Sequence, residues 1–243
     1  MSRSAEHSAH RARRRRAWSA FWAAALTVLA GFVAVGEARV LGDAVEQRTL
    51  AAFYDLPADD ATAGAPGDLV RSQELVGVPF DARAWRVMYR TSDVHGAVVF
   101  ATGIVVTPAG PAPAAGRTVL SWGHPTTGAA AECAPSRGFD PYALIEGMRL
   151  LLDRGYTIAA TDYVGMGTDG PDSYLVGDTG GNAVLDAVRA ARHLPAAHAS
   201  TDVVLWGHSQ GGQAVLFAAQ RAPQYAPELT VRGVAVAAPA ADL

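Results

Sequence analysis

The chain has 243 residues, of which 50% are hydrophobic and 18% are charged, so its composition is that of a globular protein and not of a disordered one. All 20 basic residues are arginine, and the lack of lysine excludes Schiff-base, P-loop and Ser-x-x-Lys chemistries. Six of these arginines precede residue 37. Residues 37–243 therefore contain 14 arginines and 22 acidic residues, a net charge of about −8. This negative charge argues against nucleic acid as a partner.

Residues 1–36 have the pattern of an export signal. An arginine-rich start is followed by twenty uncharged, mostly apolar residues at positions 17–36, and small residues stand at Ala34 and Gly36. The apolar run is also just long enough to span a bilayer, so an uncleaved membrane anchor is a second interpretation. In either case, we expect the rest of the chain to lie outside the cytoplasm, secreted or held at a membrane through residues 17–36.

Residues 37–67 are predicted to be a lead segment and linker, because they end in a stretch rich in Asp, Ala, Gly and Pro. Three strands are then predicted at residues 68–72, 84–91 and 97–106, the second of them half-buried. The turn composition between the last two favours an antiparallel β-meander.

From residue 118 the pattern changes to strands alternating with helices, which predicts a parallel sheet with helices on both faces. Strands are predicted at 118–122, 156–161 and 231–237. A helix is predicted from about residue 142, and its inward face is formed by Leu144, Ile145, Met148, Leu151 and Leu152. A second helix is predicted from about residue 181, with Asp178 or Thr179 as its cap. Its inward residues are Val184, Leu185, Val188 and Ala191.

The chemistry-bearing stretch is Gly207-His208-Ser209-Gln210-Gly211, between an apolar run at 203–206 and an alanine-rich segment. A strand, a Gly-x-Ser-x-Gly turn and a helix form a nucleophile elbow, in which the serine is exposed on a strained corner. The backbone N–H of Gln210 would then point at an oxyanion, with the helix dipole behind it. The alternative is an ordinary turn in which Ser209 only caps the helix.

Four motifs occur in the chain: Ser121-Trp122-Gly123-His124-Pro125-Thr126-Thr127-Gly128, Cys133-Ala134-Pro135-Ser136, Asp162-Tyr163-x-Gly165-x-Gly167 and Gly207-His208-Ser209-Gln210-Gly211-Gly212. Together and in this order they resemble the lipase A-like secretory lipases, and the resemblance covers roughly residues 50–243. The resemblance implies an α/β-hydrolase fold, with a mostly parallel central sheet and an antiparallel meander at its amino-terminal side. Residues 68–243 would be the first part of this domain.

The resemblance also implies a role for Thr127, whose backbone N–H, with help from its hydroxyl, would complete the oxyanion hole. The family more often has glycine where Pro125 stands, and residues 126–128 could be only a turn. Cys133 resembles the family's disulfide cysteine, whose partner would lie beyond this sequence. From composition alone, a small buried thiol without a disulfide partner is an equally good interpretation of Cys133.

The catalytic order in this fold is Ser, then an acid, then His. After Ser209 the only acids are Glu228 and Asp242, and no histidine follows. We therefore expect the carboxy-terminal strands, the acid, the histidine and the lid to be missing. The strand at 231–237 should then be an open edge, with Val234 and Val236 more exposed than residues 203–205.

The sequence thus predicts an exported serine ester hydrolase that resembles triacylglycerol lipases, forms an acyl-enzyme on Ser209, uses no metal or cofactor, and acts on small-molecule esters or lipids. Without a base the serine hydroxyl stays protonated, so this chain by itself should be nearly inactive. The alternative is a non-catalytic exported domain that binds an apolar ligand or a partner through the same cleft.

Overall fold

The computed structural model describes residues 50–56, 63–168, 170 and 173–241, together with the single positions 18, 22 and 27. The predicted export segment and Asp242 therefore lie outside the described residues, apart from those three positions. Among the described residues, no helix is both long and apolar enough to cross a membrane. Residues Phe53–Leu243 form one compact unit, and this unit carries every strand of the sheet.

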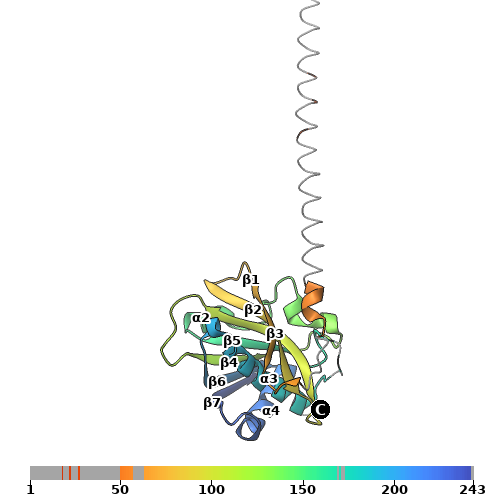
Figure 1. Ribbon diagram of the computed structural model, residues 1–243, viewed down its shortest axis with the longest axis vertical. Coiled ribbons are helices and arrows are strands. Elements are labelled where there is room, and N and C mark those ends of the chain that lie inside the picture. Colours follow the sequence, from red (N-terminus) through yellow and green to blue (C-terminus); the bar gives the residue numbers. More distant parts are fainter. Residues whose placement is uncertain are drawn as a thin grey trace, which may run out of the picture. The chain divides into compact units, whose positions relative to one another are not determined.

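The described residues form a seven-stranded mixed sheet in the order β1-β2-β3-β5-β4-β6-β7 (Figure 1). The first three strands are antiparallel, as predicted, and β3 also runs antiparallel to β5. The remaining strands, β5, β4, β6 and β7 in sheet order, are mutually parallel. Their bounds are β1 Leu69–Leu75, β2 Ala82–Ser92, β3 Val98–Pro108, β4 Arg117–Gly123, β5 Thr157–Tyr163, β6 Ala199–His208 and β7 Thr230–Ala237.

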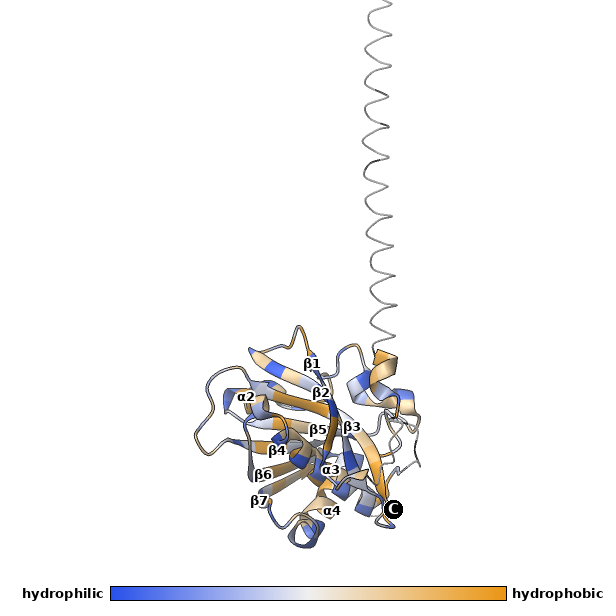
Figure 2. Ribbon diagram, in the orientation of Figure 1, coloured by the Kyte–Doolittle hydropathy of each residue, from blue (hydrophilic) through white to orange (hydrophobic). Residues whose placement is uncertain are grey.

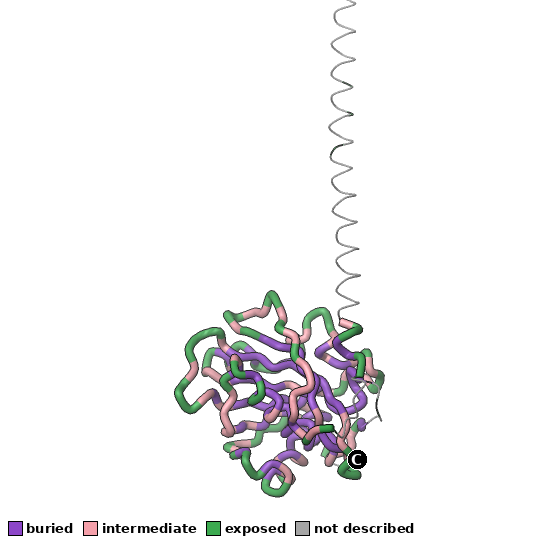
Figure 3. Tube along the Cα trace, viewed as in Figure 1, coloured by how far each residue is buried: buried purple, intermediate pink, exposed green. Residues whose placement is uncertain are grey.

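Helices cover both faces of the sheet, with one hydrophobic cluster on each side. The larger cluster lies under α3 and α4 and the smaller one under α2, so the apolar strands form a buried centre (Figures 2 and 3). This arrangement confirms the predicted α/β-hydrolase architecture. The helices are α2 Met148–Asp153, α3 Gly177–Arg192 and α4 Gln210–Tyr225, and the 3-10 turns are η2 Ala131–Cys133, η3 Pro135–Arg137 and η4 Pro195–Ala197.

Three sequence predictions of local structure were wrong. The helix predicted from residue 142 begins only at Met148, because Gly147 has a φ of 77° that interrupts any earlier turn, and Leu144 is exposed. The helix α3 begins four residues before the predicted start, and neither predicted residue caps it. Strand β2 is buried on both faces, not half-buried, because both hydrophobic clusters extend over it.

Strand β7 lies at the edge of the sheet within the described part of the chain. The exposed fractions of Val234 and Val236 are 41% and 37%, whereas Val203 and Leu205 in the neighbouring strand are both 0% exposed. The expected difference in exposure is therefore confirmed. An apolar edge strand without a cover is a surface on which another chain can pair.

The amino-terminal end of α4 packs directly against the carboxyl end of β4. A Cβ atom on Gly211 would lie 1.9 Å from the carbonyl oxygen of Gly123, and one on Gly207 would lie 2.2 Å from the carbonyl oxygen of Gly211. No side chain fits at such distances, so glycine is required at both positions. The contact also brings the loop after β4 beside the first residues of α4.

A polar cluster joins α3 to α4 at Asp186, whose side chain is fully buried. Asp186 accepts hydrogen bonds from Tyr225 Oη at 2.6 Å and from Arg189 Nη1 at 2.8 Å. Arg189 is shared with Glu228, which accepts from its Nε at 2.7 Å. Removal from water outweighs these contacts and raises the pKa of Asp186 to about 6.

Replacing Gly211 with alanine should destabilise the fold by roughly 3 kcal/mol or more, because the new methyl group forces two backbone segments apart. Urea denaturation followed by circular dichroism measures this loss. The matched control is Gly233→Ala in β7, where a Cβ meets no atom within 4 Å. We expect the control to stay within about 1 kcal/mol of wild type. Equal stability of the two variants would contradict the packing argument.

The raised pKa of Asp186 predicts a pH-dependent stability. The carboxyl group binds its proton more tightly in the folded state than in the unfolded state, whose pKa is near 3.8. Its stabilising contribution is therefore complete below about pH 4 and is lost as the pH rises through 6, by up to about 3 kcal/mol.

Thermal unfolding of wild type and Asp186→Asn between pH 4.5 and 7.5 tests this prediction. Asparagine resembles the protonated acid and cannot titrate, so the variant should lose this part of the pH dependence. If both proteins show the same pH profile, Asp186 is ionised throughout this range and the prediction is wrong.

Candidate active site

Ser209 lies at the junction between β6 and α4, where the chain turns sharply. Its backbone has φ 55° and ψ −118°, a conformation that L-residues rarely adopt and that costs about 1–3 kcal/mol. The Ser209 side chain makes no capping hydrogen bond to α4. The alternative that Ser209 serves only as a helix cap is therefore wrong.

Hydrogen bonds from the next strand and from the segment after it hold this corner. The N–H of Ser209 donates to the carbonyl of Ala237 at 2.9 Å, and the carbonyl of Ser209 accepts from the N–H groups of Gln213 and Ala240 at 3.2 Å each. Gly212 packs closely on Pro239, where an added Cβ would come within 2.9 Å. The strained conformation of Ser209 is thus imposed by strand β7 and the residues beyond it.

Two backbone N–H groups are candidates for an oxyanion hole. Gln210 is the first residue of α4, where N–H groups have no partner inside the helix. Its side chain is buried, and Oε1 has no partner among the described residues. Thr127 is half-buried, and its N–H donates to no acceptor within the described residues. Its hydroxyl donates to the carbonyl of Cys133 at 2.9 Å.

His124 begins the loop that contains Thr127, but it is a buried residue. Its exposed fraction is 2%, its Nδ1 lies 2.7 Å from the carbonyl oxygen of Pro125, and its ring packs on Tyr163 with centroids 4.6 Å apart. Burial lowers the pKa of His124, so its imidazole is neutral near pH 7. The structure contains no hydrogen bond from His124 to Ser209 among the described residues.

His208 is next to Ser209 in sequence, but its side chain bonds elsewhere. Its Nδ1 lies 2.6 Å from Oε1 of Glu146, a contact between residues 62 positions apart. Along β6, His208 shares a face with Trp206, which packs against the cluster under α2, whereas α4 covers the other face. The Glu146–His208 pair had no signal in the sequence. It is a carboxylate–histidine pair near the elbow, yet it makes no hydrogen bond to Ser209.

Cys133 is a free thiol in the loop between β4 and α2. It is half-buried and packs on Gly128, where an added Cβ would come within 2.4 Å of the sulfur atom. Its carbonyl group accepts the Thr127 hydroxyl described above. Cys133 is therefore part of the internal packing of this loop.

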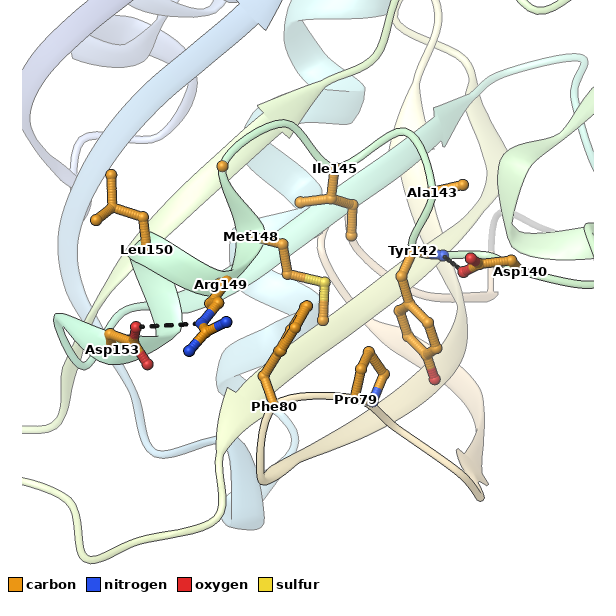
Figure 4. Close-up of a pocket in the computed structure, with 11 residues that line it drawn as sticks. Pro79, Phe80, Asp140, Tyr142, Ala143, Ile145, Met148, Arg149, Leu150 and Asp153 are labelled. Carbon is orange, nitrogen blue, oxygen red and sulfur yellow. Dashed lines mark hydrogen bonds and ion pairs between the residues drawn. The ribbon is translucent and has the colours of Figure 1, made fainter.

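An open cavity of about 650 Å³ lies beside α2. Phe80, Tyr142 and Met148 point into it, and Arg149 lies across from Phe80 with its guanidinium 5.8 Å from the ring centroid (Figure 4). Phe80 and Asp81 have positive φ angles of 64° and 50°, so the turn that presents this ring is strained. The cavity has a largely apolar lining, and no sequence pattern had indicated it.

Comparison with known proteins finds similar lipases. The family model described as secretory lipase matches residues 144–243. A probable inactive lipase (MT1628) of Mycobacterium tuberculosis is 31% identical over 209 residues, covering 79% of this chain and 45% of the relative. Lipase A of Moesziomyces aphidis is 27% identical over 195 residues, covering 74% and 41%. The chain thus spans less than half the length of these curated relatives.

Solved structures agree with the sequence matches. Candida antarctica lipase A in its closed state superposes with a TM-score of 0.64 at 26% identity, covering 76% of this chain and 44% of that one. The rice cell wall degrading esterase LipA of Xanthomonas oryzae gives a TM-score of 0.55 at 27% identity, covering 71% and 50%. With its mixed sheet, its glycine-flanked serine elbow and these matches, the chain has the α/β-hydrolase fold and is similar to the secretory lipases.

Proposed function

We propose that this protein is an exported serine ester hydrolase in which Ser209 is the nucleophile. The observation that carries the proposal is the elbow: Ser209 has a strained backbone, lies between glycines that permit the turn, and leaves its side chain unused by the helix. Similarity to the secretory lipases supports an ester or lipid as the substrate. The division into an export segment (1–36), a linker (37–67) and a hydrolase region (68–243) is part of the same proposal.

The proposed reaction passes through an acyl-enzyme. Ser209 Oγ attacks the ester carbonyl carbon, and the N–H groups of Gln210 and Thr127 stabilise the oxyanion that forms. The tetrahedral intermediate then expels the alcohol, which takes up a proton, and water later cleaves the acyl–serine bond.

A general base must remove the Ser209 proton in the first step. Among the described residues, no histidine is hydrogen-bonded to Ser209. The Nδ1 atoms of His124 and His208 contact Pro125 and Glu146, and the buried Nε2 of His124 has no partner. A serine hydroxyl without a base is a weak nucleophile. We therefore propose that this chain by itself hydrolyses esters at little more than the background rate.

Supplying a base from solution tests the role of Ser209. A fluorophosphonate probe should form a phosphorus–oxygen bond to Ser209 Oγ and release fluoride. Imidazole added to the buffer would accept the serine proton. We expect imidazole to accelerate this adduct roughly 10²-fold or more, the ordinary contribution of general-base catalysis. Peptide mass spectrometry identifies the modified residue.

The variants Ser209→Ala and Ser200→Ala are the matched pair for this experiment, because Ser200 lies at the start of β6, the strand that ends just before Ser209. The first should lose the adduct and the second should keep it. A probe that modifies another serine, or that reacts equally with Ser209→Ala, would rule out Ser209 as the nucleophile.

A second candidate is a non-catalytic domain that binds an apolar ligand. It is supported by the 650 Å³ cavity beside α2 and by the similarity to a mycobacterial protein that is named a probable inactive lipase. Leu150 and Phe80 line this cavity and are 56% and 49% exposed, so a bound apolar chain would cover both.

Fluorescence titration with a dansyl-labelled fatty acid tests the second candidate. Leu150→Asp should weaken binding about tenfold or more, since it places a charge in the apolar lining. Val94→Asp is the control, because Val94 is 49% exposed and lies outside the cavity. Equal affinity of the two variants would locate binding elsewhere and remove this candidate.

A further inference from the structure

The segment that follows β4 is bonded to the end of β5 at several points, none of which takes part in the proposed chemistry. This segment, residues 124–137, is here called the oxyanion loop because it contains Thr127. The residues that hold it belong to the motif Asp162-Tyr163-x-Gly165-x-Gly167. The sequence had singled out this motif without assigning a role to it.

Asp162 holds the far end of the oxyanion loop through Ser136. The Asp162 side chain is 2% exposed, its Oδ1 accepts the N–H of Ser136 at 3.0 Å, and its Oδ2 accepts the Ser136 hydroxyl. Thr102 Oγ1 donates to the same Oδ2 at 2.6 Å, which joins the carboxylate to the neighbouring strand β3. Ser136 is itself fully buried, and Arg86 Nε donates to its carbonyl oxygen at 2.9 Å. A buried carboxylate with this many donors is fixed in one position.

Tyr163 holds the near end of the same loop. Its hydroxyl donates to the carbonyl of His124 at 3.1 Å, and its ring packs on the imidazole of that residue. Gly167 adds a third tie, because its N–H donates to the carbonyl of Ala131 at 2.9 Å. The oxyanion loop is therefore bonded to one short segment of the chain at its beginning, middle and end.

The backbone of Tyr163 is strained. Its φ is 69°, a conformation that is rare for a bulky residue, yet its side chain is buried and hydrogen-bonded. Strain of this kind persists only where the surrounding contacts determine the conformation, and it is concentrated at functional sites. Ser209 also has a positive φ, 55°, and Tyr163 lies at the end of β5, the strand that pairs with β4, which in turn pairs with β6 before the elbow.

We propose that Asp162 and Tyr163 are positioning residues that clamp the oxyanion loop and thereby fix the N–H of Thr127 for an oxyanion formed at Ser209. This inference rests on the proposed function, because a fixed loop matters only if Thr127 stabilises an oxyanion. Neither residue touches the reacting atoms. Their contribution is preorganisation, since donors that are fixed in advance need no rearrangement in the transition state.

The oxyanion loop contains its own probe, Cys133, which is the only cysteine in the sequence. Tyr163→Phe removes the hydrogen bond to His124, and Asp162→Asn disturbs the bonds to Ser136. The control is Tyr225→Phe, which likewise removes one hydrogen-bonded tyrosine hydroxyl. The Tyr225 hydroxyl donates to the buried carboxylate of Asp186, between α3 and α4 and not in the oxyanion loop. Melting temperatures measured for all variants show how much of any change is global.

Thiol reactivity and amide hydrogen exchange measure the loop in native buffer. We expect Cys133 to react roughly five- to tenfold faster in Tyr163→Phe, the change expected for one lost buried hydrogen bond. The amides of residues 125–137 should lose protection in parallel. Tyr225→Phe should leave both measurements at the wild-type value, even if its melting temperature falls equally. If Asp162→Asn does not fold, Tyr163→Phe alone decides.

The rate of imidazole-assisted phosphonylation of Ser209 then tests whether fixing the oxyanion loop affects the reactivity of the elbow serine. A looser loop together with slower adduct formation in Tyr163→Phe, but not in Tyr225→Phe, supports the proposal. Unchanged loop protection overturns it, and so does a looser loop with an unchanged adduct rate. A wild-type chain without any Ser209 adduct refutes the proposed function instead, and the loop measurements then support or overturn the clamp by themselves.

Discussion

The close approach of α4 to the end of β4 is the contact on which the candidate site depends. Gly211 lies so near Gly123 that no side chain fits between the two backbones. This approach places the first N–H groups of α4 next to the loop that follows β4, so donors from two separate elements can meet at one point. The same crowding turns the chain sharply at Ser209, because the strand must end and the helix must begin within a single residue.

The strained backbone of Ser209 is held by hydrogen bonds to neighbouring backbone groups and not by the serine side chain. Strand β7 accepts the N–H of Ser209, and the residues after β7 donate to its carbonyl oxygen. The hydroxyl is thereby left for chemistry, but a hydroxyl alone is a poor nucleophile. Its activation needs a base, and both nearby histidines use their Nδ1 atoms for contacts with Pro125 and Glu146. The position of the candidate nucleophile and its activation are therefore separate properties of this fold.

Two buried aspartates show how similar chemistry serves different purposes. Asp186 lies between α3 and α4, where Tyr225 and Arg189 bond it, and it joins two helices under the sheet. Asp162 lies at the end of β5, where Ser136 and Thr102 donate to it, and it joins a loop to a strand. Desolvation raises the pKa of both carboxyl groups. The difference in role comes only from the elements that supply the donors.

Local patterns in the sequence were enough for the strand order of the meander, the strand–helix alternation and the serine elbow, since each depends on residues close together in the chain. The glycine spacing around Ser209 also predicted the tight turn, because only a residue without a Cβ allows it. The start of α2 at Met148 was not predictable, since apolar periodicity continued through Gly147 and only its left-handed backbone ended the helix. The start of α3 was missed because no side chain caps it.

The surroundings of the elbow were decided by tertiary structure alone. His208 meets Glu146 across 62 positions, and Tyr163 meets His124 across 39. Neither contact leaves a local pattern, because each depends on which strands become neighbours and on which face a side chain lies. A sequence motif can therefore locate the elbow and its serine, whereas the side chains that contact the neighbours of that serine follow only from how the strands assemble into the sheet.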